Sequence, residues 1–147
     1  PTHSSAASLA KCCNDPVVMG APNVVRAGSQ AGNVSATVLI QRGLCDALVS
    51  DYHYPSLANA AWALIDRGLC DLPRAWAMIS STPAEIMRLP DRGQLNPGKR
   101  ADLVVINART RVIEATISNG RLAYLSGEAG ARFIGAAIQS PRQIAAE

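Results

Sequence analysis

Two short, mainly apolar runs, each followed by a loop and a helical pattern, constrain the fold of this chain most. Residues 16–21 and 47–50 are bounded by turn residues, as expected for buried strands of a parallel sheet. Apolar residues recur at helical spacing over residues 4–14, 34–43 and 55–68. The resulting order of helix, strand, loop, helix, strand, loop and helix is typical of βα units. We therefore predict an α/β fold with parallel strands.

Several residues mark the expected helix boundaries. Gly43 and Gly68 are predicted to end the helices that precede them. Asp71 is predicted to cap a helix that runs to Ile79. The stretch 82–85 (TPAE) matches a capping box with proline at the first helical position, and it predicts the start of a further helix.

The sequence pattern changes after Leu89, from helical spacing to turn residues and short strands. Turn residues dominate residues 90–98, and short alternating strands are predicted after them. Asn119-Gly120 predicts a tight hairpin between two of these strands. The predicted strands of this small antiparallel β element are residues 102–107, 112–118 and 121–125.

Composition excludes some classes of function. The chain has 147 residues, of which 48% are hydrophobic and 17% charged, so it has enough apolar residues for a globular core. Its net charge is +3 and its arginines are scattered, whereas a nucleic-acid binder would show a clustered basic face. We expect no membrane span, because no run of ~18 apolar residues occurs. An anionic small-molecule substrate is compatible with this charge.

The cysteines and the first residues bear on the cellular compartment of the protein and on where its sequence begins. Cys12, Cys13, Cys45 and Cys70 lack metal-binding spacing and are predicted to be small buried residues of a reduced, cytoplasmic protein. The first residues show no signal-peptide pattern and no initiator Met. We expect the chain to begin within a longer protein.

The first candidate site is the loop after the first predicted strand, residues 22–33. It contains two glycines, a hydroxyl group, amides and Arg26 just before a helix. Free backbone N–H groups at a helix N-terminus favour an anion such as phosphate, and the planar guanidinium of Arg26 could clamp it. The alternative is an ordinary polar loop whose glycines serve turn geometry.

The second candidate site is "SDYHYP", residues 50–55, directly after the second predicted strand. Asp51 could bind a metal and take a proton from water, or it could cap the turn that follows. Tyr52 and Tyr54 could donate hydrogen bonds to a substrate or simply pack. His53 is expected to be a surface residue rather than a metal ligand.

Three stretches of sequence resemble a known family. "VVMGAPNVVRAGSQAGNVSA" (17–36) and "GLCDALVSDYHYPSLANAAW" (43–62) resemble the PhnM family of phosphonate-metabolism enzymes. "STPAEIMRLPDRGQLNPGKRADLVVIN" (81–107) looks like the ending of the amidohydrolase superfamily, to which that family belongs. The resemblance covers residues 1–125.

This resemblance implies a fold and an activity. The fold would be α/β: the C-terminal part of a (β/α)8, TIM-like barrel of a metal-dependent hydrolase, plus strands of a small β-sandwich. Residues 1–89 would be the last βα units and helices of the barrel, residues 90–126 the β-sandwich strands and residues 127–147 a tail. The family hydrolyses α-D-ribose 1-methylphosphonate 5-triphosphate to the 5-phosphate and pyrophosphate.

The resemblance also implies roles for particular residues. Asp51 would be both a metal ligand and the catalytic general base. The cofactor would be a divalent metal, binuclear zinc or else iron or manganese, with most of its ligands upstream of this chain. The substrate-binding residues would be Asn23, Arg26, Ser29, Gln30, Asn33, Tyr52 and Tyr54.

Two departures from the family pattern leave the substrate open. Gln30 stands where the family has histidine, and His53 lengthens the second loop by one residue. An amidohydrolase that acts on an amide or cyclic amide C–N bond is therefore an alternative, as is a truncated, non-catalytic relative. We expect no nucleic-acid partner; a homo-oligomer and association with other phosphonate-degradation proteins are compatible with this interpretation.

Overall fold

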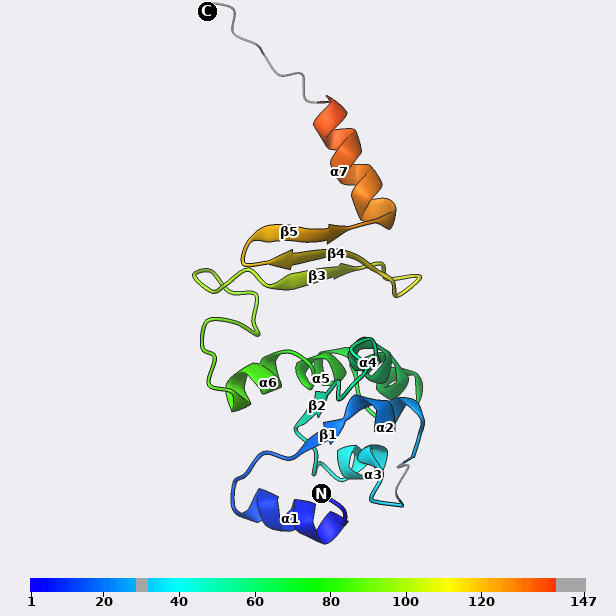
Figure 1. Cartoon of the computed structure of the whole chain (residues 1–147), viewed down its shortest axis with the longest axis vertical. Helices are drawn as coiled ribbons and strands as arrows, with labels where there is room; N and C mark the ends of the chain where they lie inside the picture. Colours follow the sequence, from blue (N-terminus) through cyan, green and yellow to red (C-terminus); the bar gives the residue numbers. More distant parts are fainter. Residues whose placement is uncertain (29–31, 140–147) are drawn as a thin grey trace, which may run out of the picture. The chain divides into compact units, whose positions relative to one another are not determined.

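The computed structural model describes residues 1–28 and 32–139 of the chain, and side chains through residue 135. The chain divides into two compact units, Pro1–Gln94 and Leu95–Glu147 (Figure 1). Each unit is described by itself below. None of the helices in the described ranges has both the length and the hydropathy that a bilayer-spanning helix needs.

The first unit is built on a pair of short parallel strands, β1 (Val18–Gly20) and β2 (Ala47–Val49). Their register pairs Val18 with Ala47 and Gly20 with Val49. The two predicted strands and their parallel pairing are confirmed. Because the strands are parallel, the loops that leave Gly20 and Val49 emerge at the same end of the pair.

Six helices accompany these strands (Figure 1). The helices predicted around residues 4–14, 34–43 and 55–68 are present in slightly shorter form. Helix α2 (Ala21–Val25) packs on α4 (Ser56–Asp66). The six helices are α1 (Ser4–Cys12), α2 (Ala21–Val25), α3 (Ala36–Gln41), α4 (Ser56–Asp66), α5 (Leu72–Ala77) and α6 (Ser81–Ile86).

The core of the first unit lies between these helices and β2. Its largest fully buried side chains are Val24, Leu39, Ile40, Leu48 and Leu64. Burying one such side chain contributes roughly 1.5–3 kcal/mol. The core joins α2, α3, β2 and α4, so it fixes the positions from which the two candidate loops depart.

Five of these helices end in the same way, with a residue of positive φ followed by return hydrogen bonds to the last turn. At the end of α4 the Gly68 amide donates to Ile65 O at 2.9 Å and the Leu69 amide to Leu64 O at 2.9 Å. The predicted stops at Gly43 and Gly68 are confirmed. The five residues of positive φ are Asn14, Ala27, Gly43, Gly68 and Arg88.

Predictions for the next two helices had different outcomes. Asp71 caps α5 as predicted, because its Oδ1 accepts a hydrogen bond from the Arg74 amide at 3.0 Å. The capping box at residues 82–85 is wrong: α6 begins at Ser81, after Ser80, and has no side-chain cap. The Ser80 hydroxyl donates to Trp76 O at 2.8 Å, so the tight connection from α5 sets the start of α6.

A correction also applies to the first candidate loop, which was predicted to begin at Pro22. Residues 21–25 form the helix α2 instead. Pro22 stands at the start of this helix, where its missing N–H costs nothing, and Val24 is fully buried in the core. The irregular loop therefore begins only after α2.

The second unit contains an antiparallel sheet of β3 (Leu103–Ile106), β4 (Ile113–Ser118) and β5 (Arg121–Leu125), in that order. The predicted hairpin at Asn119-Gly120 is confirmed, and both turn residues have positive φ, at 51° and 73°. A helix that the sequence did not predict, α7 (Gly127–Gln139), follows β5.

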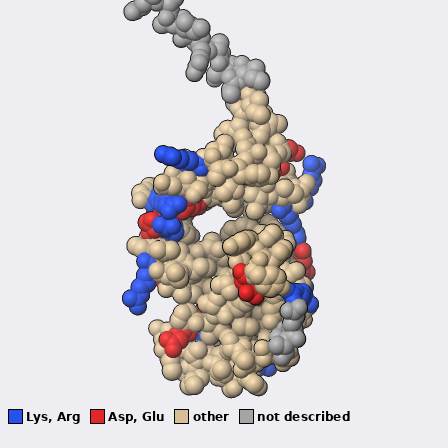
Figure 2. All heavy atoms as spheres, viewed as in Figure 1, with Lys and Arg blue, Asp and Glu red and all other residues tan. Residues whose placement is uncertain are grey.

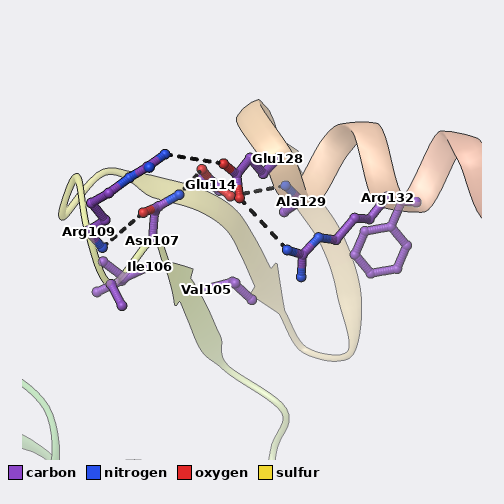
Figure 3. Close-up of a pocket in the computed structure, with 10 residues that line it drawn as sticks. Val105, Ile106, Asn107, Arg109, Glu114, Glu128, Ala129 and Arg132 are labelled. Carbon is purple, nitrogen blue, oxygen red and sulfur yellow. Dashed lines mark hydrogen bonds and ion pairs between the residues drawn. The ribbon is translucent and has the colours of Figure 1, made fainter.

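Glu114 on β4 holds the start of α7 (Figure 3). Its carboxylate accepts hydrogen bonds from Asn107 Nδ2 at 2.9 Å and from the Ala129 amide at 3.0 Å. The bond from Asn107, followed by that from Ala129, lowers the pKa of Glu114. Gly127 allows this approach, because a Cβ at its position would lie 2.8 Å from Glu114 Oε1.

Asp46 joins α1 to the strand pair. Its carboxylate accepts hydrogen bonds from Lys11 Nζ at 2.6 Å and from the Val17 amide at 2.8 Å. Partial burial acts to raise the pKa of Asp46, but the bonds from Lys11 and Val17 outweigh it, and the pKa is lowered. A carboxyl whose pKa is lower in the folded state stabilises the fold above its unfolded pKa.

We predict that part of the stability of the first unit is lost at acid pH through Asp46. The contribution is fully present above the unfolded pKa, about 3.9, and disappears as pH falls through the lower folded value. Thermal melts between pH 7 and pH 2.5 should therefore fall less steeply for Asp46→Asn than for the wild type. Lys11→Gln should reduce the slope in the same direction, and equal slopes in all three proteins would contradict the prediction.

Candidate functional site

The candidate site lies where the chain leaves the carboxyl ends of β1 and β2. In parallel α/β folds, ligands bind at this end of the strands, on the loops that lead into helices. Here β1 leads into α2 and the loop after it, and β2 leads into the turn that contains Asp51. The turn that contains Asp51 therefore starts at the same end of the strand pair as α2, and the first candidate loop follows α2.

Asp51 occupies a tight turn directly after β2. Its φ is +57°, in the left-handed region that few residues other than glycine adopt, and its side chain is exposed. The turn is closed by a hydrogen bond from the His53 amide to Ser50 O at 3.1 Å. Such backbone conformations persist where the surrounding structure maintains them, and they cluster at functional sites.

Ser56, the first residue of α4, anchors this turn. It is one of two buried polar residues in the described part of the chain, at 3% exposure. Its hydroxyl donates toward His53 O at 2.5 Å and lies 3.4 Å from Ser50 O, and its amide donates to His53 O at 3.0 Å. The carbonyl groups on both sides of Asp51 are therefore held by a side chain that the sequence analysis did not single out.

The structure brings Arg26 and Tyr52 together from the two loops. The Arg26 guanidinium donates a hydrogen bond to the Tyr52 hydroxyl oxygen. Both side chains are exposed, and Tyr52 directly follows Asp51. A cationic group and a phenol that can still donate its own proton therefore meet at the residue that follows the predicted base in the sequence.

The other predicted substrate contacts have different settings. Tyr54 is 81% exposed and Asn33 is exposed, while Ser29 and Gln30 lie outside the described residues. Asn23 is half-buried, and its Oδ1 accepts a hydrogen bond from the Ala36 amide at 3.1 Å. Because this bond uses the first amide of α3, that amide is not free to bind an anion as the sequence pattern predicted.

The residues present do not make a metal centre by themselves. Among residues 1–28 and 32–139, no group of three or more His, Cys, Asp or Glu side chains is placed to hold a metal ion. Asp51 supplies one exposed carboxylate, which suits one position in the coordination shell of a divalent metal. Further ligands would have to come from residues other than those that the structure describes.

The prediction that all four cysteines are buried is wrong for two of them. Cys12 and Cys13 are exposed at the end of α1, where the helix turns its last residues toward solvent, and Cys70 is half-buried. Cys45 is buried, and its burial, with the charge of Asp46, raises the pKa of the thiol to about 12. The Cys45 thiol is therefore protonated and unreactive at neutral pH.

A pocket in the described structure belongs to the other unit and is not the candidate active site (Figure 3). This cavity, of about 600 Å³, lies between the end of β3, β4 and α7. Its buried acid, Glu114, already binds Asn107 and the start of α7. Arg109 and Arg132 flank the exposed Glu128 at 3.7 and 3.8 Å, so the cavity contains paired charges rather than a set of converging catalytic groups.

Charged side chains do not gather into one strong patch on the face that Figure 2 shows. Basic groups occur in several separate places and are interspersed with acidic ones.

Comparison with known proteins identifies the family. Residues 52–127 match the amidohydrolase family, more than half of the chain. The chain belongs to the amidohydrolase family. This match begins one residue after Asp51 and includes α4, α5, α6 and the strands of the second unit.

Two curated relatives show what the chain is similar to. It is 43% identical over 111 residues to the alpha-D-ribose 1-methylphosphonate 5-triphosphate diphosphatase of Escherichia coli (strain K12), covering 74% of this chain and 29% of that protein. It is 34% identical over 109 residues to an adenine deaminase of Methanoregula boonei, covering 66% of this chain and 19% of that protein. The chain thus spans less than a third of the length of these relatives.

Solved structures agree on the fold. Two structures of β-aspartyl dipeptidase from Fervidobacterium islandicum AW-1 resemble the chain with TM-scores of 0.61 and 0.54 at 16% and 17% identity. They are matched over 78% and 63% of this chain, and over 32% and 28% of their own length. At such low identity the likeness shows the fold alone. Together with the family match it supports an α/β amidohydrolase fold, and the predicted α/β class is confirmed.

Proposed function

We propose that this chain is the C-terminal part of a metal-dependent hydrolase of phosphonate catabolism that releases pyrophosphate from α-D-ribose 1-methylphosphonate 5-triphosphate. The observation that carries the proposal is the 43% identity to the E. coli diphosphatase over 74% of the chain. It is supported by the contact of Arg26 with Tyr52, which directly follows Asp51, beyond the carboxyl ends of two parallel strands.

The proposed fold follows from the same comparison. Residues 1–89 are proposed to contribute the last βα units and helices of a (β/α)8 barrel. Residues 90–126 would form strands of a small β-sandwich and residues 127–147 a tail. The parallel pair β1–β2 and the antiparallel sheet β3–β4–β5 are compatible with these two parts.

Asp51 is the proposed catalytic base and one metal ligand. Its exposed carboxylate, at the end of β2, can accept a proton from the attacking water. A divalent metal, with binuclear zinc as the first choice and iron or manganese as alternatives, supplies Lewis-acid activation of water when bound. Ser56 holds the backbone carbonyls of Ser50 and His53, on both sides of Asp51.

Arg26 and Tyr52 are the proposed contacts for the polyphosphate. A guanidinium binds phosphate oxygens through paired N–H donors, and a phenol can donate one more hydrogen bond. In the reaction, a water oxygen forms a new bond to phosphorus, the P–O–P link between the α- and β-phosphoryl groups breaks, and pyrophosphate leaves. Arg26 would balance negative charge on these groups as the link breaks.

Hydrolysis of a C–N bond is the second candidate function. The 34% identity to an adenine deaminase favours it, and so does Gln30, which can form hydrogen bonds but cannot titrate near neutral pH. In that reaction water would attack carbon, and the products would include ammonia or an amine rather than pyrophosphate.

Product analysis decides between the two candidates. The protein encoded by the complete reading frame that contains this chain should be supplied in turn with zinc, iron and manganese. It is then given the ribose triphosphate and, separately, adenine and a β-aspartyl dipeptide. We expect pyrophosphate from the first compound and no release of ammonia or amino acid from the others. Turnover of a C–N substrate without pyrophosphate release would overturn the proposal.

A further inference from the structure

Arg67 stands outside the candidate site but contacts the element that carries Arg26. It is the residue that directly follows α4, and its side chain crosses to α2, more than forty positions earlier in the sequence. Its Nη1 donates to Val24 O at 2.7 Å and its Nη2 donates to Val25 O at 3.2 Å. One guanidinium therefore holds the two carbonyls that immediately precede Arg26.

The contacts from Arg67 matter because α2 is short and ends at Arg26. Arg26 is the last residue of this helix turn, and Ala27 follows it with a φ of +60°. The Ala27 amide donates to Val24 O at 3.1 Å and the Gly28 amide to Asn23 O at 3.2 Å. Because α2 has only five residues, it has little intrinsic stability, and its geometry depends on what it packs against.

The Arg26 side chain then points from this held turn to Tyr52. Its backbone is fixed through α4 by Arg67, and its guanidinium is fixed through the turn after β2 by Tyr52. The charge of Arg26 is thus placed at Tyr52, the residue that follows Asp51, before any ligand arrives. An arginine with a defined position binds an anion with less loss of side-chain entropy than a free one.

We propose that Arg67 is a positioning residue for Arg26 and thereby sets the affinity of the site for a polyphosphate. This inference rests on the proposed function, in which Arg26 contacts the phosphate groups. Arg67 itself need not touch the substrate, because its donors are directed at the carbonyls of Val24 and Val25.

The chain offers a matched control for a purely structural role. Arg74 also donates from Nη2 to a carbonyl at a helix end, Ile40 O in α3, at 3.2 Å. Its bond spans a similar sequence separation, within the same unit. Arg74→Gln therefore removes a comparable contact that leads to neither Arg26 nor Tyr52.

The test measures binding of inorganic tripolyphosphate by calorimetry to the complete protein, alongside steady-state pyrophosphate release and thermal melts. The variants are Arg67→Gln, Arg67→Lys, Arg74→Gln, Arg26→Gln and the double variant Arg26→Gln/Arg67→Gln. We expect Arg67→Gln to weaken tripolyphosphate binding and raise KM about tenfold, with kcat changed less than threefold. The tripolyphosphate affinity and KM of Arg67→Lys should lie between those of Arg67→Gln and the wild type. Arg74→Gln should match the wild type in both.

Non-additivity is the decisive readout. If Arg67 acts through Arg26, the double variant should bind tripolyphosphate within twofold of Arg26→Gln alone. Additive losses, or a folded Arg67→Gln or Arg67→Lys protein with wild-type affinity, would overturn the inference. Should Arg67→Gln not fold, Arg67→Lys carries the same comparison. A wild-type protein that does not bind tripolyphosphate would also overturn it. Arg67-dependent binding without pyrophosphate release would refute only the proposed function.

Discussion

An Asp51→Asn variant of the complete protein is expected to release pyrophosphate about 10²–10⁴ times more slowly than the wild type, the usual contribution of a positioned general base. The amide cannot accept a proton from water, and it is a weaker metal ligand than a carboxylate. Asparagine tolerates positive φ, so the turn at +57° should keep its shape. The loss should therefore appear in kcat, with little change in melting temperature.

Asp71→Asn is a suitable control for this variant. It makes the same acid-to-amide change in the same unit, at the cap of α5, where asparagine caps a helix about as well as aspartate. Its activity and melting temperature should match those of the wild type. An Asp51→Asn protein with a rate within threefold of the wild type would refute the role given to that carboxylate.

A Gly93→Ala substitution is expected to have the largest effect on stability. Gly93 has a φ of +84°, and a Cβ there would lie 2.9 Å from Ala84 Cβ and 3.1 Å from Ser81 Cα. The left-handed conformation costs an L-residue about 1–2 kcal/mol, and overpacking adds about 1–3 kcal/mol. We expect the free energy of unfolding of the first unit to fall by about 2–5 kcal/mol in urea titrations.

Gly68→Ala separates the two causes of this loss. Gly68 has a φ of +66°, and a Cβ there meets nothing within 4 Å. The substitution should therefore cost only the conformational part, about 1–2 kcal/mol. If Gly93→Ala is no more destabilising than Gly68→Ala, then α6 can shift at no cost. The close approach of a Cβ at position 93 to Ala84 and Ser81 would then have no effect on stability.

The sequence predicted those features that depend on local pattern. The strands around Met19 and Leu48, the stops at Gly43 and Gly68 and the Asn119-Gly120 hairpin all follow from apolar runs or from residues that favour positive φ. Asp51 could be singled out for the same reason, because an acid directly after a buried strand stands at the ligand-binding end of a parallel sheet.

Features that depend on distant residues could not be read in this way. The helix α7 has three glycines in thirteen residues, which is a poor helical pattern. Its start is held by Glu114 on strand β4. The short helix α2 is held by Arg67 and by burial of Val24. These contacts join positions 15 to 43 residues apart, so no local window of sequence contains them.

The same distinction applies to the site. The candidate residues Arg26 and Tyr52 were named separately from the sequence, but their contact arises only because two parallel strands deliver their loops to one end. Ser56 and Arg67 were missed because each acts by binding backbone carbonyl groups, which no sequence pattern reveals. Ser56 binds those of Ser50 and His53, and Arg67 binds those of Val24 and Val25. A serine at a predicted helix start, five residues after an acid, is a local signal that could have drawn attention to Ser56.

The most direct test of the central claim uses this chain in place of the corresponding C-terminal segment of the E. coli diphosphatase. Pyrophosphate release from the ribose triphosphate is then followed by phosphorus NMR. If the chain carries a functional part of such an enzyme, the chimera should release pyrophosphate, and its Asp51→Asn form should not. A chimera that melts cooperatively and releases no pyrophosphate with zinc, iron or manganese would contradict this account.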